Sequence, residues 1–372
     1  MRNYLVRSKQ KALDLPFITA TVLMVILGLV IIYDATPVAA FHDFGDKLYY
    51  FKNQLIWATL GSFALIFFSF FDYHKLLKFA YPLLSASVLL LLAVLVPGIG
   101  SKIYGARRWI SIAGFSFQPS EIAKLALIFY ETAVISKFEN FKISFKDAFL
   151  VIFLPAFAVT GLVLVQPDLG TALILASLTL TIYFVGGGPL KHLVLALSAI
   201  IVAGVGAIIL EPYRFARFKS FLDPAHDPQG ASYQINQILI ALSQGGLFGV
   251  GLGGSRSKFD FIPEVQGDAI FAVFVEELGF IGAVLLIALF LFIISRGIAI
   301  ARNAPDPTGK ILAIGLVGLI AVQALFNLAS VVALVPLTGV PLPFISYGGS
   351  SLFVIVAAIG ILINIERQSQ KA

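Results

Sequence analysis

Long apolar runs separated by short polar or charged segments fill almost the whole chain. Most runs contain about 17–25 residues, the length with which an α-helix crosses about 30 Å of hydrocarbon. The runs and the polar, Pro-rich or Gly-rich residues between them predict ten membrane-spanning helices. The expected spans are residues 15–36, 53–71, 80–97, 119–136, 148–165, 169–185, 190–210, 269–295, 311–335 and 351–366. We therefore expect an all-α polytopic membrane protein in which residues 1–372 form a single membrane domain.

The basic residues predict the orientation of these helices. Most Lys and Arg residues of the short connecting segments fall on the side of the N-terminus, among them Lys75, Lys137 and Lys191. Because cytoplasmic loops carry an excess of Lys and Arg, both termini are expected in the cytoplasm. The first apolar run is too long for the apolar part of a secretion signal, so we expect it to remain as the first helix.

The composition supports a membrane protein and excludes several other classes. Hydrophobic residues make up 59% of the chain and charged residues 12%, with a mean hydropathy of +0.95. A soluble domain is about a quarter charged, so we expect no nucleic-acid binding despite the net charge of +6. The chain contains no cysteine and four scattered histidines, which excludes disulfides and cysteine metal sites and argues against a histidine cluster.

The loop of residues 211–268 is the longest segment outside the predicted spans. It contains apolar residues at helical spacing, which predict a helix lying in the membrane interface: Ile235, Ile238, Leu239 and Leu242. Glycines gather at residues 245–254, but no Gly-Lys-Ser/Thr follows them, so a phosphate-binding loop is not predicted. We expect these glycines to provide backbone flexibility.

Residues 336–351 form a second unusual segment, because Pro336, Pro341 and Pro343 prevent a regular helix. Irregular backbone at membrane depth is tolerated only where protein covers it or a cavity hydrates it. This segment is therefore expected either to be buried by the helices or to line a cavity.

Charged residues inside or beside spans each need a partner or a function, since an ionisable group costs at least about 2.5–3.5 kcal/mol at the bilayer centre. Glu121 and Lys124 share one helix face, and Glu131 lies about 10 Å deeper on the same stripe. Intrahelical pairing explains Glu121 and Lys124, and burial with hydrogen bonding explains Glu131, whereas a functional role is the alternative. Asp168 precedes the span of residues 169–185 and is expected to cap it.

The span of residues 269–295 raises the same question. Asp268 precedes it at the outer surface, and a continuous helix would place Glu276 and Glu277 about 12 Å further into the membrane. Lys124 would then lie at the depth of Asp268, where the two could pair. Helix capping explains Asp268 equally well, and buried hydrogen bonding explains the two glutamates.

Arg107, Arg108 and Trp109 lie in a predicted outer loop. Arginine binds phosphate oxygens through two parallel hydrogen bonds, so the pair could hold a pyrophosphate-linked lipid. Arg and Trp at an interface also anchor helices to ordinary phospholipid headgroups. The residues alone leave both interpretations open.

Five motifs occur in a fixed order along the chain. They are Gly105-Ala106-Arg107-Arg108-Trp109-Ile110, Gln118-Pro119-Ser120-Glu121-Ile122-Ala123-Lys124, Gln166-Pro167-Asp168-Leu169-Gly170-Thr171, Pro263-Glu264 with Glu276-Glu277-Leu278-Gly279, and Pro341-Leu342-Pro343-Phe344-Ile345-Ser346-Tyr347-Gly348-Gly349-Ser350-Ser351. In order and spacing they resemble the SEDS family (shape, elongation, division and sporulation), from the first span to the last. The family commonly has His-Thr-Asp-Phe where this chain has Gln266-Gly267-Asp268-Ala269, so the aspartate is retained while its neighbours differ.

The resemblance implies a peptidoglycan glycosyltransferase of the bacterial cytoplasmic membrane. Members polymerise the lipid-linked disaccharide precursor lipid II at the outer face. They work with a class B penicillin-binding transpeptidase and with other membrane proteins of the division or elongation complex. The motif that ends in Ser-Tyr-Gly-Gly-Ser-Ser-Leu favours the division type over the elongation type.

The resemblance also implies roles for individual residues. The proposed catalytic aspartate of the family corresponds to Asp268, its associated lysine and glutamate to Lys124 and Glu121, its outer-loop arginine and tryptophan to Arg108 and Trp109, and its cavity-lining loop to Ser346 and Tyr347. A shallow carboxylate suits a general base that takes a proton from the attacking sugar hydroxyl. The departing lipid pyrophosphate needs positive charge from Arg107, Arg108, Lys124 or a divalent metal such as Mg²⁺ or Mn²⁺.

Two other functions are compatible with the pattern of charges. A flippase for lipid-linked precursors, or another transporter, would use Glu131, Glu276 and Glu277 as a polar path across the bilayer. A non-catalytic scaffold for cell-wall synthesis would tolerate loss of any of these groups. Polymerisation requires the shallow Asp268, so substitution at the two depths distinguishes the three functions.

Overall fold

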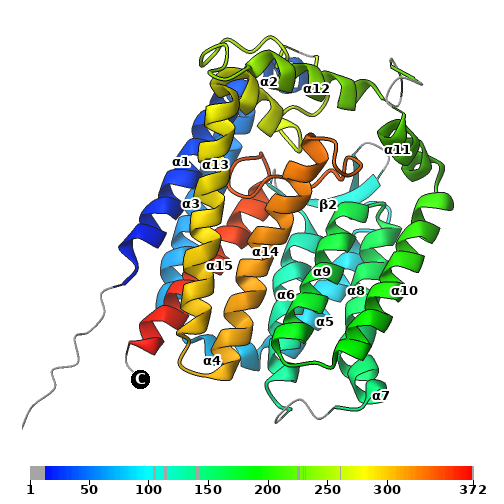
Figure 1. Ribbon diagram of the computed structural model, residues 1–372, viewed down its shortest axis with the longest axis vertical. Helices are drawn as coiled ribbons and strands as arrows, with labels where there is room; N and C mark the ends of the chain where they lie inside the picture. The colour runs from blue at the N-terminus through cyan, green and yellow to red at the C-terminus, as the bar shows by residue number, and fades with distance from the viewer. Residues whose placement is uncertain are drawn as a thin grey trace, which may run out of the picture.

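The computed structural model describes residues 13–103, 106–112, 115–138, 143–223, 227–228, 230, 232–259 and 261–370. Gly105, the first residue of the motif that contains Arg107 and Arg108, lies outside these residues. The helices stand side by side in one bundle (Figure 1). Their bounds are α1 Leu15–Ala35, α2 Pro37–Phe44, α3 Tyr49–Phe70, α4 Tyr73–Lys78, α5 Ala80–Ala93, α6 Pro119–Ile135, α7 Phe145–Ala148, α8 Leu154–Val165, α9 Leu169–Val185, α10 Leu190–Ile209, α11 Pro212–Leu222, α12 Tyr233–Gly245, α13 Ile270–Arg302, α14 Pro307–Val331 and α15 Gly349–Ser369, with a π-helical turn at Phe149–Phe153.

The long apolar helices confirm a polytopic membrane protein but give fewer clear spans than the sequence predicts. Seven helices of the described residues are long and apolar enough to cross a membrane: α1, α3, α7 to α8, α10, α13, α14 and α15. The other three predicted spans coincide with the shorter helices α5, α6 and α9, of 14, 17 and 17 residues. Each predicted span therefore contains a helix, and seven of these helices reach the expected length.

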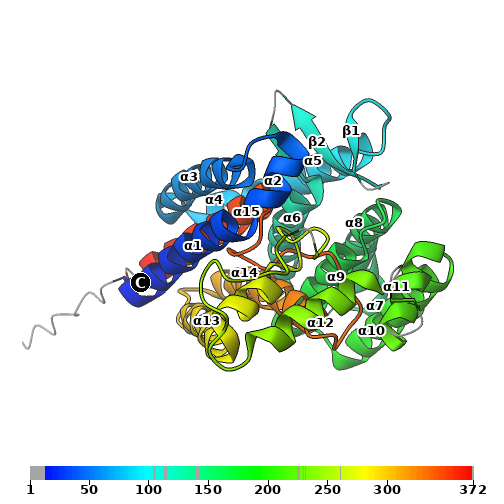
Figure 2. The ribbon, with the colours of Figure 1, turned by 90° about the horizontal axis from the view of Figure 1, so that it is seen from above.

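Burial differs sharply between the helices and places α15 in the middle of the bundle. In the apolar window of α15, 89% of the residues are buried, against 6% in α10. The view from above shows α15 among α1, α3, α6 and α14 and places α10 at the periphery (Figure 2). Small residues allow this close packing, since a Cβ at Gly360 would lie 2.6 Å from the carbonyl oxygen of Leu65 on α3.

Both termini of the described chain lie at the same end of the bundle (Figure 1). We call this the inner end and the opposite one, which carries α2 and α12, the outer end. The sequence predicted termini on one side, and the arrangement agrees. The expected helix across the interface is α12, which lies across the outer end and buries Ile235 and Ile238.

A small sheet at the outer end was not predicted. Strands β1 (Gly100–Ile103), β2 (Ala106–Ile112) and β3 (Phe115–Phe117) pair antiparallel in the order β1-β2-β3. Residue Trp109 of β2 lies opposite Ser101, and Ile110 lies opposite Phe117. The sequence showed these residues only as a connecting loop, because the strands are too short to give a clear period-2 pattern.

Helix α13 is not the continuous helix that the sequence predicted. It breaks at Gly279, whose φ of 68° and ψ of −170° are not helical. Its outer part, residues 270–278, is a short helix with its own direction. We call this part the outer half-helix of α13.

The segment between α14 and α15 is irregular, as its prolines predicted, and protein covers it. Val340, Leu342 and Ile345 are all less than 3% exposed. The segment packs tightly against α1, where a Cβ at Gly28 would lie 2.0 Å from the carbonyl oxygen of Phe344. Protein therefore covers this irregular backbone, which is one of the conditions that make it tolerable at membrane depth.

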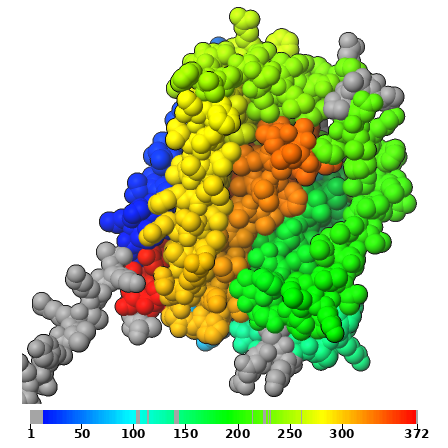
Figure 3. Space-filling view, viewed as in Figure 1, coloured from blue at the N-terminus to red at the C-terminus, as the bar shows by residue number. Residues whose placement is uncertain are grey.

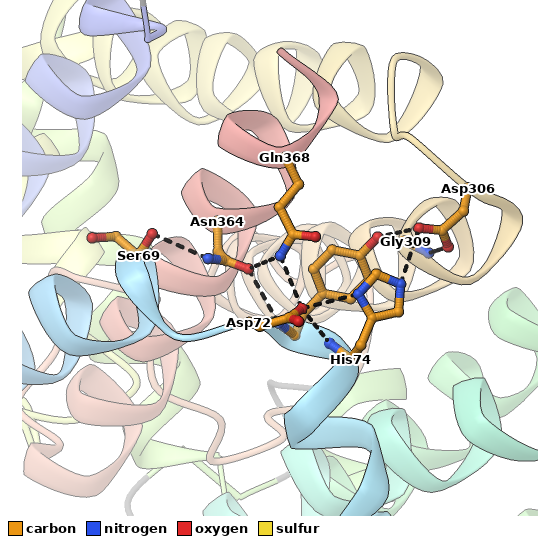
Figure 4. A network of polar contacts seen from close by, with 8 residues as sticks. Ser69, Asp72, His74, Asp306, Gly309, Asn364 and Gln368 are labelled. Carbon is orange, nitrogen blue, oxygen red and sulfur yellow. Dashed lines mark hydrogen bonds and ion pairs between the residues drawn. The ribbon is translucent and has the colours of Figure 1, made fainter. Parts of the chain in front are cut away.

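A polar network closes the inner end (Figure 4). The His74 ring lies between two carboxylates, 2.9 Å from Asp72 and 3.2 Å from Asp306. Asp306 also caps α14 by accepting a hydrogen bond from the Gly309 N–H. On α15, Asn364 accepts a hydrogen bond from the backbone N–H of Tyr73 at 3.1 Å. These contacts join the turn between α3 and α4 to the ends of α14 and α15.

Candidate active site

Asp268 lies at the start of the outer half-helix, buried beneath the outer loops. Its side chain is 5% exposed, and its Oδ1 atom has no hydrogen-bond partner among the described residues. The N-cap of α13 is Ala269, which makes no side-chain capping bond. Asp268 thus precedes the N-cap position, whereas Asp168 is the N-cap of α9 and its Oδ1 accepts from the Thr171 N–H at 3.0 Å. The capping prediction for Asp168 is confirmed.

Two arginines and a second carboxylate surround Asp268. Burial raises the pKa of Asp268, while the charge of Arg217 and nearby backbone N–H groups, including that of Gly339, oppose the increase. Glu264 lies at the mouth, where partial desolvation by the surrounding loops and the charge of Asp268 raise its pKa, and Arg217 and Arg108 oppose the increase. Residues from α11, β2 and the loop before α13 therefore share one electrostatic environment.

Backbone strain marks the loops around this group. Glu264 and Phe344 have positive φ angles of 51° and 66°. Such conformations cost of order 1–3 kcal/mol for residues other than glycine and gather at functional sites. Glu264 lies four residues before Asp268, and the carbonyl oxygen of Pro167 accepts a hydrogen bond from the Arg108 guanidinium.

Two side-chain amides on α14 hold the Asp268 backbone and the irregular segment before α15. Asn327 donates to the carbonyl oxygen of Asp268 at 2.9 Å and to that of Val340 at 2.8 Å. Gln323, one turn away, donates to the carbonyl oxygen of Pro341 at 3.0 Å. Both side chains are fully buried. One face of α14 thus connects Asp268 to the irregular segment before α15.

Lys124 does not pair with Asp268, although its predicted depth suggested that the two could pair. Its ammonium lies 2.8 Å from the Glu121 carboxylate and donates to Oε1 of Gln323 at 2.8 Å. All three side chains are at most 2% exposed. The intrahelical pair predicted for Glu121 and Lys124 is therefore present, and Gln323 connects it to the face of α14 that holds Asp268.

Glu276 and Glu277 are not deep in the bundle, because the break at Gly279 changes the course of α13. Glu276 accepts from the Ser255 hydroxyl at 2.6 Å, and Glu277 accepts from the Lys258 ammonium at 2.8 Å. Lys258 also contacts Asp34 at the outer end of α1. The predicted polar path across the bilayer through these two glutamates is therefore wrong. Both carboxylates instead accept hydrogen bonds, as the simpler prediction expected. Glu131 is fully buried, and neither of its carboxylate oxygens has a partner among the described residues.

The arginines of the outer loop are largely engaged with the backbone. Arg108 donates from Nε to the carbonyl oxygen of Gln166 at 2.9 Å, and Arg107 donates to that of Leu95 at 3.3 Å. Trp109 is half-buried beside them. These contacts attach the sheet to the turn before α9. Arg108 is nevertheless close enough to Glu264 to lower its pKa.

Ser346 and Tyr347 shape the irregular segment on the side of Asp268. The Ser346 hydroxyl accepts from the Leu342 N–H at 2.8 Å, and the Tyr347 N–H donates to the carbonyl oxygen of Gln266 at 2.8 Å. The Tyr347 ring lies edge-on to Tyr50, with 4.8 Å between centroids. These bonds place the segment next to the residues that precede Asp268.

The donor set for a divalent cation is small. The described residues contain no group of three or more His, Asp or Glu side chains placed to hold a metal ion. Mg²⁺ is usually bound through one or two carboxylates plus substrate phosphates. Asp268, with its unpartnered oxygen, and Glu264 therefore fit such a cation only together with a phosphate-bearing substrate.

Sequence reasoning missed four residues of this site: Glu264, Arg217, Gln323 and Asn327. The two amides gave a usable signal, since they are polar residues four apart in an otherwise apolar span, which predicts one buried polar face. Glu264 stands in one of the five motifs, but no role was inferred for it. Arg217 gave no signal, because only the folded loops bring it beside Asp268.

Comparisons with known proteins identify the family. The model of the cell cycle protein family of FtsW, RodA and SpoVE matches residues 14–371. Stage V sporulation protein E of Bacillus subtilis is 40% identical over 364 residues, covering 98% of this chain and 99% of that protein. A probable peptidoglycan glycosyltransferase FtsW of Trichlorobacter lovleyi is 40% identical over 355 residues, covering 95% and 92%.

Solved structures show the same architecture. A chain from a study of polymerisation and crosslinking by a peptidoglycan synthase complex matches with a TM-score of 0.79 and 30% identity, covering 96% of this chain and 98% of that one. The rod shape determining protein RodA of Thermus thermophilus matches with a TM-score of 0.70 and 30% identity, covering 96% and 97%.

Proposed function

The chain belongs to the cell cycle protein family of FtsW, RodA and SpoVE, also called SEDS, and is a multi-pass membrane peptidoglycan glycosyltransferase; on this premise we propose that it polymerises lipid II with Asp268 as general base. The observation that carries this proposal is the buried carboxylate of Asp268, whose Oδ1 is unpartnered, beside Arg217 and Glu264. The unpartnered Oδ1 atom leaves one oxygen of this carboxylate able to accept a proton.

The reaction forms one bond and breaks another at the anomeric carbon of the donor sugar. The acceptor hydroxyl attacks this carbon, and its proton passes to Asp268. The bond from the carbon to the pyrophosphate oxygen breaks, and the electron pair leaves with the lipid pyrophosphate. Arg217 and Arg108 supply positive charge where negative charge develops. A divalent cation held by Asp268 and Glu264 would add to this charge.

The remaining sequence-predicted residues support the site in this proposal. Lys124 and Glu121 act through Gln323, which holds the loop at Pro341. Ser346 and Tyr347 shape the wall beside Gln266, and Arg107 and Trp109 hold the sheet. A deep carboxylate path for a flippase retains only Glu131, so the geometry favours polymerisation.

We place the site at the outer face of the bacterial cytoplasmic membrane, with ten spans and both termini in the cytoplasm. The short helices α5, α6 and α9 run alongside the long ones and complete the ten (Figure 1). One similar structure comes from a study of polymerisation together with crosslinking. This supports a class B penicillin-binding transpeptidase as partner, with other division or elongation proteins. The similarity to several FtsW proteins supports the division type.

Polymerisation of purified lipid II tests the base. Asp268→Asn keeps the size of the side chain but cannot take the proton, so the rate should fall about 10²–10⁴-fold. The matched control is Asp46→Asn, which removes an exposed carboxylate that contacts Lys52 at the same end of the molecule, and it should keep the wild-type rate. Glycan made by Asp268→Asn at the wild-type rate would reject Asp268 as base. Loss of polymerisation in Glu131→Gln would instead favour a transport function.

A further inference from the structure

The break in α13 leaves backbone groups without helical partners, and the glycine-rich segment after α12 supplies them. The Val250 and Gly251 N–H groups donate to the carbonyl oxygens of Glu276 and Glu277, each at 3.0 Å. Beyond the break, the Phe280 N–H donates to the carbonyl oxygen of Gly246 at 2.9 Å. The unpaired ends of both helix pieces are thus satisfied by one neighbouring segment.

Two glycines of this segment serve close packing, which the sequence did not predict, and others adopt the positive φ angles that glycine permits. A Cβ at Gly249 would lie 2.0 Å from the carbonyl oxygen of Glu277, and one at Gly245 would lie 2.2 Å from that of Val275. In the space-filling view, α12 and the following loop cover the upper end of α13 (Figure 3). The outer half-helix is therefore enclosed by this loop.

The end of the same loop binds the two glutamates of the half-helix. Ser255 donates from its hydroxyl to Glu276 at 2.6 Å and from its N–H to Glu277 at 3.2 Å. The Arg256 N–H donates to Glu276 at 3.0 Å, and Lys258 contacts Glu277 at 2.8 Å. These bonds close residues 255–277 into a ring that contains Asp268.

Lys258 attaches this ring to α1. Its ammonium lies 2.8 Å from Oε1 of Glu277 and 2.8 Å from Oδ2 of Asp34, and its side chain is 6% exposed. Burial lowers the pKa of Lys258, but the two carboxylates outweigh this and raise it, so the lysine stays charged at neutral pH. Two carboxylates from different elements share one buried cation, and removing that cation would leave both uncompensated.

The geometry points to Lys258 as a positioning residue that holds the Asp268-bearing half-helix against α1 and so sets the placement of the base. The inference rests on the proposed function, because it assigns Lys258 a part in that same reaction. Lys258 lies at the far end of the half-helix from Asp268 and acts through it. Displacement of a catalytic group by about 1 Å can cost about 10²-fold in rate.

Lipid II polymerisation by the full chain tests this role. Lys258→Met should lower kcat about 10–100-fold and leave KM nearly unchanged, because substrate binding does not use Lys258. Lys258→Arg, which keeps the charge, should restore most of kcat. Lys52→Met is the matched control, since Lys52 contacts Asp46 at 2.8 Å at the same end but is 59% exposed. Asp34→Asn removes the same link from the other partner and should lower kcat as well.

A distance measurement separates positioning from a general loss of stability. The chain has no cysteine, so spin labels can be attached at cysteines introduced for Phe261 and Val30, which are 53% and 50% exposed. The distance distribution between the labels should broaden in Lys258→Met and stay narrow in Lys258→Arg and Lys52→Met.

Each other result overturns the inference. Wild-type kcat in Lys258→Met, or loss of kcat with an unchanged distance distribution, would show that Lys258 does not position the base. If Lys258→Met fails to fold, Asp34→Asn with wild-type kcat and an unchanged distribution has the same meaning. Failure of the proposed function looks different, because the wild type would then make no glycan or Asp268→Asn would remain active.

Discussion

Asp268 and Glu264 form a pair of carboxylates at the outer mouth, and their surroundings give them different roles. Asp268 is buried, whereas the Glu264 side chain is in part open to solvent. Desolvation, complete for Asp268 and partial for Glu264, raises the pKa of both, and Arg217 opposes the increase in both. The buried member is the better base, because its proton affinity is higher than that of an ordinary aspartate and it remains within reach of the enclosed site.

The pH dependence of polymerisation should reveal this environment. A base must be deprotonated, so kcat/KM should fall on acidification as Asp268 takes a proton. Because the pKa of Asp268 is raised, the fall should begin at a higher pH than for an ordinary aspartate. Arg217→Gln removes a charge that lowers this pKa, so the acid limb should move to still higher pH. A pH–rate profile measures this.

Lys52→Met is the control for that profile, since Lys52 interacts with Asp46 and is not among the groups that shift the pKa of Asp268. Its acid limb should coincide with that of the wild type. An acid limb in Arg217→Gln that stays in place or moves to lower pH would contradict the proposed contact between Arg217 and the base.

At the scale of elements, the break in α13 determines the geometry of the site. A continuous helix would carry Glu276 and Glu277 down into the membrane, whereas the break keeps them with Ser255 and Lys258 at the outer end. Gly279 permits the break, since its φ of 68° lies in the region that favours glycine. The half-helix can therefore hold Asp268 at one end and an ionic contact at the other.

Gly249→Ala should destabilise the protein through this break. The new Cβ would meet the carbonyl oxygen of Glu277 at 2.0 Å, and the φ of +79° adds strain. Overpacking of this kind costs about 1–3 kcal/mol, so the unfolding temperature in detergent should fall. Gly206→Ala is the matched control, because nothing lies within 4 Å of its Cβ position. Equal unfolding temperatures for the two variants would contradict the close packing described here.

At the scale of the whole molecule, the two ends of the bundle are built differently. The outer end carries the sheet, α2 and α12 over the site, whereas the inner end is closed by the network around His74 (Figures 1 and 4). This polarity fits a substrate that is used on one side of the membrane only. The basic residues of the short loops predict that the outer end faces away from the cytoplasm.

Labelling of single cysteines should confirm the orientation. Ser116 and Ser144 are both exposed, and they lie on β3 and next to α7, at opposite ends of the bundle. Ser116→Cys should react with a membrane-impermeant thiol reagent on intact spheroplasts, whereas Ser144→Cys should react only after permeabilisation. The wild-type chain, which contains no cysteine, is the control for unspecific labelling. Reaction of Ser144→Cys alone on intact cells would place the site in the cytoplasm.

The sequence by itself determined the class of the protein and the positions of its helices. Apolar runs long enough to cross a membrane must be helical, because no water is available there for unpaired backbone groups. All ten predicted runs accordingly contain helices. The intrahelical pair of Glu121 and Lys124 and the cap at Asp168 were also predictable, since residues three apart on a helix, or at its start, are fixed by local geometry.

Only the tertiary structure decided what surrounds Asp268. Arg217, Glu264 and Asn327 come from separate elements, and no local periodicity relates them. The break at Gly279 was hidden for a similar reason, since a single glycine is tolerated in many helices and becomes a break only where another segment satisfies the freed backbone groups. That partner, residues 246–251, approaches through folding of the long outer loop. Local geometry therefore set the helices, and long-range packing set the site.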